Sequence, residues 1–140
     1  MPSPLLTAAD WQEVREQIDT SLDVLALPDA VVGRDAYAGA AMREVIARDP
    51  LAETRTGADG ARVRLAAIYL TAARLCPAVP ALSRETHGET TYQRLTIDPA
   101  KRAEELRGLA ESELAAVLDP GDATPYRPTM FRLASGRRGR

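Results

Sequence analysis

Side chains that could carry nucleophilic catalysis are scarce in this chain of 140 residues. Cys76 is the only cysteine and His87 the only histidine, so a thiolate–imidazole pair would have to join these two residues. Cys76 ends an apolar stretch before Pro77, where a free thiol acts as a small buried hydrophobic group. His87 lies in a polar segment that is typical of an exposed loop. We therefore expect no catalytic residues.

Carboxylates are the other candidates, because paired acids can perform general acid–base catalysis. Glu104 and Glu105 are adjacent, and Glu111 and Glu113 are two residues apart, so each pair points to different sides of a helix. The usual Cys/His ligands of a zinc site are missing, and no phosphate-binding glycine loop is present. The sequence thus predicts a protein that is not an enzyme and that holds no metal and no cofactor.

Length and composition favour one mostly α-helical domain. A chain of this size can bury a core without disulfides or metal. Alanine and leucine supply most of the apolar atoms and aromatic residues are only 4% of the chain, which favours close helix–helix contact over a sheet. No apolar run approaches the roughly 20 residues that span a bilayer, and residues 1–12 lack the pattern of a signal peptide. We expect synthesis in a reducing cytoplasm and no membrane partner.

Charge is divided unevenly along the chain. Residues 126–140 contain five arginines and no acid, whereas the whole chain has a net charge of −2, so the rest of the chain carries −7. Residues 119–140 also contain three prolines and three glycines, which predicts an extended basic tail after a helical domain of residues 1–118. Apolar side chains alternate with the arginines, as in segments that become ordered on a protein partner. The expected docking residues are Tyr126, Arg127, Met130, Phe131, Arg132, Leu133, Arg137, Arg138 and Arg140.

A bundle of about four helices is expected from the apolar periodicity. The first helix begins near Thr7, and Pro28 ends this element. Its apolar stripe consists of Trp11, Val14, Ile18 and Leu22. After a short extended or turn stretch at Asp29–Gly33, the second helix spans about Arg34 to Arg48 and stops before Pro50.

The third and fourth helices have clearer signals. The third, about Ala61–Cys76, follows a connector at residues 51–60 and is apolar on most sides, which predicts a central position. The last has Asp98 as its N-cap and Pro99 at its first position. Its apolar stripe consists of Leu106, Ala110, Leu114 and Val117. Between these helices, residues 83–97 have raised β propensity, so we expect an extended arm or a small hairpin there.

Two segments resemble the head–tail connector proteins of tailed phages, also called adaptor or head-completion proteins. The segment LPDAVVGRDAYAGAAMREVIARDP resembles the opening of these proteins. The longer segment, YLTAARLCPAVPALSRETHGETTYQRLTIDPAKRAEELRGLAESELAAVL, has the family's order of a helix ending at Pro77, a turn with Pro80, an arm and a final helix that starts at Asp98. The resemblance covers about residues 27–118. Residues 1–26 and the arginine-rich end do not follow the family's pattern.

The resemblance implies a compact helical protein that forms a homo-oligomeric ring, expected to be a dodecamer, beneath the portal protein in the neck of the virion. Such a ring extends the channel for double-stranded DNA, which passes without sequence recognition, and gives a platform for further neck or tail proteins. By the same resemblance the tail would grip the portal, and the arm would face a neighbouring subunit or the channel. The arm residues concerned are Arg84, Glu85, His87, Glu89, Tyr92 and Arg94. An acidic body along a channel would repel DNA and let it slide.

A second class of function is a small helical DNA-binding or regulatory protein that uses the basic tail. Five arginines would neutralise at most about five phosphates, so binding would be weak and salt-sensitive. The sequence has no helix-turn-helix, no zinc finger and no aromatic stacking platform that would read bases. For the tail itself, a third possibility is a disordered C-terminus that binds no partner. A connector should bind portal at moderate salt, whereas a regulator should bind duplex DNA with a steep salt dependence.

Overall fold

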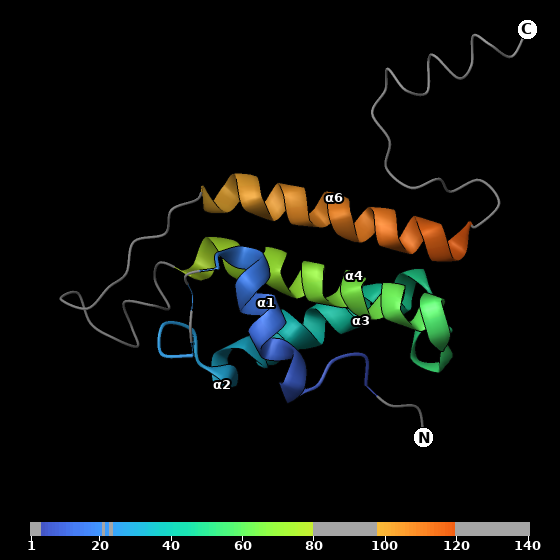
Figure 1. Cartoon of the computed structure of the whole chain (residues 1–140), viewed down its shortest axis with the longest axis horizontal. Coiled ribbons are helices and arrows are strands. Elements are labelled where there is room, and N and C mark those ends of the chain that lie inside the picture. The colour runs from blue at the N-terminus through green and yellow to red at the C-terminus, as the bar shows by residue number, and fades with distance from the viewer. Residues whose placement is uncertain (1–3, 21, 23, 80–97, 120–140) are drawn as a thin grey trace, which may run out of the picture.

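The computed structural model describes residues 4–20, 22, 24–79 and 98–119, and this part of the chain is mostly helical (Figure 1). Its α-helices are α1 (Trp11–Ile18), α2 (Asp29–Val32), α3 (Ala40–Arg48), α4 (Gly57–Leu75) and α6 (Pro99–Leu118). Single 3-10 turns occupy Ala8–Asp10, Ala52–Thr54 and Cys76–Ala78, and a π-helical turn spans Asp35–Gly39. The prediction of a mostly α bundle of about four helices is confirmed, with α2 as one additional turn.

Helix α4 is the centre of the bundle. It packs against α6, α1 and α3, and Figure 1 shows it lying between α6 and the other two helices. Its buried residues lie on most of its sides: Val63, Ala66, Ala67, Ile68, Leu70, Thr71, Ala72, Ala73 and Leu75. Many of them are alanines, which let a neighbouring backbone approach closely. The hydroxyl of Thr71 donates to the carbonyl of Ala67 at 2.8 Å, so this buried polar group is satisfied.

Helix α6 runs antiparallel to α4 along its length (Figure 1). The carboxylate of Asp98 accepts the backbone N–H of Ala100 at 3.1 Å, which confirms the predicted N-cap. The predicted stripe is buried at every position, namely Leu106, Ala110, Leu114 and Val117. Near the other end, Arg62 of α4 donates to Glu113 of α6 at 3.1 Å, which ties the start of α4 to the last turns of α6.

The first helix is shorter than the sequence predicts. Helix α1 ends at Ile18, and Asp19 already has an extended backbone with φ −162° and ψ 126°. Asp and Thr side chains compete for backbone hydrogen bonds and favour helix ends. In addition, Nε of Arg102 in α6 donates to the carbonyl of Gln17 at 2.8 Å and satisfies one group at this helix end. Leu22, predicted on the helix stripe, is buried beyond the helix.

Two further boundaries differ from the prediction. Asp29–Val32 form one α-helical turn where an extended or turn stretch was expected, and the second helix opens with the wide turn Asp35–Gly39. Helix α4 begins at Gly57 and not at Ala61. Gly57 has a φ of +64°, a conformation that favours glycine, so this glycine starts the helix where the sequence suggested a connector. None of the described helices is both long enough and apolar enough to cross a lipid bilayer.

Candidate functional site

Both segments predicted to bind partners lie outside the described residues. The arm residues are Arg84, Glu85, His87, Glu89, Tyr92 and Arg94, and the tail residues lie between 126 and 140. What the structure places are the points where these segments join the bundle. The arm joins the described residues at Val79 and Asp98, and the tail joins them at Asp119.

These attachment points lie at opposite ends of the α4–α6 pair (Figure 1). We call the end at Val79 and Asp98 the arm end, and the end at Asp119 the tail end. Helix α6 has 20 residues, which at 1.5 Å per residue separates the two ends by about 30 Å. The α4–α6 pair therefore holds the attachment points of the two predicted interaction segments apart.

The charged side chains of the body mostly form ion pairs between different elements. Arg15 of α1 is almost wholly buried and donates from both Nη atoms to Asp29 of α2, at 2.8 and 2.6 Å. Arg64 of α4 forms an ion pair with Asp10. Its Nη2 atom also lies 3.3 Å from Oε1 of Glu13. The first pair ties α1 to α2, and the other two tie the N-terminal segment to the central helix α4, so these guanidinium groups are already bound by the protein's own acids.

The outer helices are joined in the same way. Arg48 at the end of α3 donates to Glu111 of α6 at 2.6 Å, and this hydrogen bond holds the pKa of Glu111 below its ordinary value. Glu44 of α3 accepts a hydrogen bond from Arg74 of α4 at 3.0 Å and lies 3.8 Å from Arg107 of α6. Together with α4, these bridges fix α3 and α6 relative to each other.

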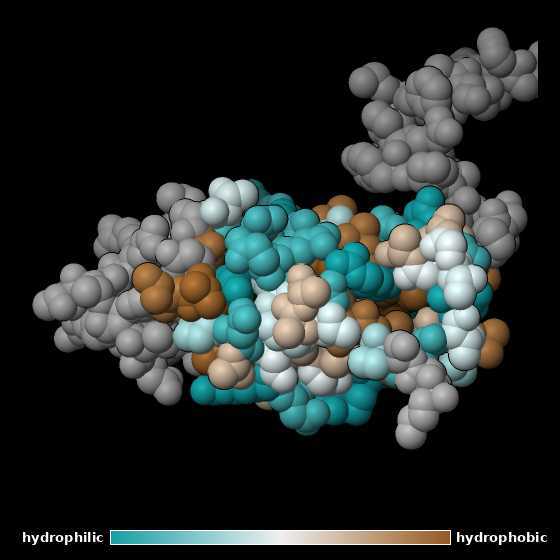
Figure 2. All heavy atoms as spheres, turned by 60° about the horizontal axis from the view of Figure 1, so that its bottom comes forward, coloured by the Kyte–Doolittle hydropathy of each residue, from teal (hydrophilic) through white to brown (hydrophobic). Residues whose placement is uncertain are grey.

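Each end of the bundle carries exposed apolar side chains. Val24 and Leu25 are 50% and 65% exposed in the loop between α1 and α2, and Leu51 is 58% exposed in the turn between α3 and α4. On the face drawn in Figure 2, several apolar patches are separated by hydrophilic surface. Exposed apolar groups at the ends suit contacts with partner proteins better than a mainly hydrophilic surface does.

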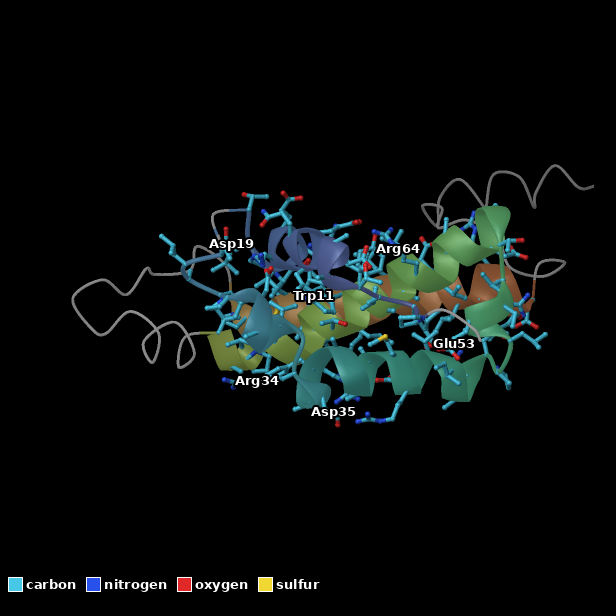
Figure 3. All side chains as sticks on the ribbon, turned by 90° about the horizontal axis from the view of Figure 1, so that it is seen from below. Trp11, Asp19, Arg34, Asp35, Glu53 and Arg64 are labelled. Atoms are coloured by element: carbon cyan, nitrogen blue, oxygen red, sulfur yellow. The ribbon has the colours of Figure 1, made fainter. Side chains whose placement is uncertain are left out.

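A groove of about 350 Å³ lies at the tail end and was not predicted from the sequence. Its lining comes from three segments: Pro4, Leu5, Ala52, Glu53, Arg55, Thr56, Gly57, Gly60, Ala61 and Arg64. Figure 3 shows Glu53 toward the opposite end of the bundle from Asp19. The only local signal is the pair of glycines in residues 51–60, a pattern that is typical of a connector.

The structure describes only some of the residues considered for chemistry. Cys76 is fully buried, and this burial raises the pKa of its thiol to about 11, as expected for a small hydrophobic group. His87 lies outside the described residues. Within residues 4–79 and 98–119, apart from the two gaps, no group of three or more His, Cys, Asp or Glu side chains could hold a metal ion.

No protein-family model, no curated protein and no solved structure matches this chain. The resemblance to head–tail connectors therefore stays a prediction from the sequence.

Proposed function

We propose that this protein is a structural head–tail connector, or adaptor, in the neck of a tailed-phage or phage-like particle. Copies of it would form a ring, expected to be dodecameric, beneath the portal protein and present a platform for further neck or tail proteins. The observation that supports this most is the attachment of the arm and the tail to opposite ends of one helix pair. A connector subunit has to contact different neighbours on different sides.

The rigidity of the body suits this role. A single core cluster joins described residues from Leu6 near the start of the chain to Val117 in α6, and ion pairs bridge α3, α4 and α6 around it. A rigid body transmits the position of one partner to the other. Assembly into a closed ring also requires that two different faces of the subunit meet.

The charge distribution suits a channel through which DNA passes. Outside residues 126–140 the chain carries −7, and most arginines of the described body already have a carboxylate partner. Binding to DNA phosphates needs free cations that displace counterions, so this acidic body would repel duplex DNA and not bind it. In the proposed ring, DNA would slide through without sequence recognition.

The test is to mix the full-length protein with the portal protein of the same particle at 150 mM salt and to examine the mixture by electron microscopy and sedimentation. We expect rings seated on the portal, and we expect deletion of residues 126–140 to abolish them while helicity by circular dichroism is retained. A matched control replaces the five tail arginines by lysine, which keeps the charge. Tail-independent portal binding would contradict the docking role of the tail.

The same preparation separates this proposal from a DNA-binding or regulatory role. A connector should bind a free 30-base-pair duplex poorly at 150 mM salt. Tight, steeply salt-dependent binding by a monomer or dimer, together with no association with portal, would overturn the proposal.

A further inference from the structure

The groove at the tail end combines apolar walls with a carboxylate that has no partner among the described residues. Leu5, Ala52 and Ala61 line it, and the half-buried Glu53 reaches it without an ion pair or hydrogen bond in the described structure. Arg55 and Arg64 also line it, but their guanidinium groups are bound to Asp49 and Asp10. The groove therefore offers a free negative charge beside apolar surface.

The surroundings of the groove carry a surplus of acid. At this end Arg48 and Arg62 are paired with Glu111 and Glu113. Glu53, Asp59 and Asp119 form no ion pair with any described residue. The exposed Leu51 lies in the same turn as Glu53. A segment that fits here should carry both cationic and apolar side chains.

One segment of this chain has that composition and starts at this end. Residues 126–140 have a charge of +5, with Met130 and Phe131 among the arginines. The tail begins after Asp119, and the contact between Arg62 and Glu113 keeps the last turns of α6 beside the start of α4. Residues 120–125 alone can span about 20 Å when extended, so residue 126 is able to turn back toward the tail end of the bundle.

We infer that the groove at the tail end, together with the adjoining hollow lined by Leu51 and Asp59, binds the C-terminal tail of the same chain. Tail arginines would face Glu53 and Asp59, and tail apolar residues would pack against Leu5 and Leu51. The short connection makes the effective concentration of the tail at its own groove high, which favours this over the tail of a second copy. Contacts of this kind are partly exposed, so they should be weak and sensitive to salt.

The docked state also has a consequence for the proposed function, and this consequence rests on that function being correct. A tail held on its own body is not free to bind the portal, so portal would have to displace it. The docked tail would then keep unassembled subunits from binding one another. Docking on the groove itself, however, can be tested without any portal protein.

The experiment is limited digestion of the full-length protein by trypsin, with the rate of cleavage after Arg132 followed by mass spectrometry. In 50 mM salt the tail should be cut at least fivefold more slowly in the wild type than in Glu53→Arg. In 500 mM salt the two rates should converge. Glu53→Gln provides a milder variant, and circular dichroism with Trp11 fluorescence verifies that each variant folds.

The matched control is Glu104→Arg, which makes the same change of charge at an exposed site near the arm end of α6. It should leave the cleavage rate within twofold of the wild type. Equal rates in the wild type and Glu53→Arg would overturn the proposal. Protection that increases with protein concentration would also overturn it, because the occupant would then be the tail of a second copy.

Discussion

Arg55 donates two hydrogen bonds to the carboxylate of Asp49, from Nε to Oδ2 at 2.5 Å and from Nη2 to Oδ1 at 3.0 Å. Oδ1 of Asp49 also accepts the backbone N–H of Leu51 at 3.2 Å. The Asp49 side chain is only 2% exposed. This pair closes the turn that leads from α3 to α4, and it neutralises the most deeply buried carboxylate of that turn.

Replacing Asp49 by Asn should destabilise the fold by about 2–4 kcal/mol, because the change leaves Arg55 without its counter-charge in a partly buried position. The free energy of unfolding can be measured in urea from the fluorescence of Trp11, the only tryptophan. The control is Asp35→Asn, which breaks the exposed pair with Arg43 and should leave the urea midpoint nearly unchanged. Equal midpoints for the wild type and Asp49→Asn would show that the pair adds no stability.

The same pair predicts how stability depends on pH. The hydrogen bond from Arg55 lowers the pKa of Asp49, against an opposing effect of burial, and Arg48 does the same to the pKa of Glu111. A carboxyl group whose pKa is lower in the folded state stabilises the fold at pH values above its unfolded pKa, about 4, and loses this contribution as the pH falls toward its folded pKa. The unfolding free energy should therefore decline below about pH 4.5. In Asp49→Asn the decline should be shallower.

Leu114→Asp tests the face that α6 turns toward α4. Leu114 is 1% exposed in the core, so a carboxylate there would lose the apolar contacts and its own hydration. We expect a loss on the order of 4 kcal/mol or more, seen as reduced helicity at 25 °C. Leu109→Asp, on the same helix but 41% exposed, should retain full helicity. If both variants stayed folded, the assigned face would be wrong.

Those parts of the fold that depend on local signals were predictable from the sequence. Asp98 and Pro99 fixed the start of α6, and the spacing from Leu106 to Val117 fixed its buried face. The apolar character of α4 on most sides predicted its central position. In each case the signal lies within one helix and needs no knowledge of its neighbours.

The remaining features depend on contacts between distant residues. Helix α1 ends where Arg102, far away in the sequence, reaches the carbonyl of Gln17. The groove at the tail end brings Leu5 beside Glu53 and Arg64, and no periodicity in the sequence indicates that they meet. Glycines were ambiguous for the same reason, because Gly57 starts a helix although glycine usually marks a connector.

Two glycines in helices should respond in opposite directions to alanine. At Gly108, in the exposed middle of α6, an added Cβ would meet no atom within 4 Å, so Gly108→Ala should raise the unfolding free energy by about 0.5–1 kcal/mol. At Gly60, in the first turns of α4, the Cβ would lie 2.7 Å from the carbonyl oxygen of Arg55. Gly60→Ala should lower the unfolding free energy, because the turn that holds Arg55 against Asp49 must shift. Urea titrations of both variants check this, and stabilisation by Gly60→Ala would contradict the close packing of that turn on α4.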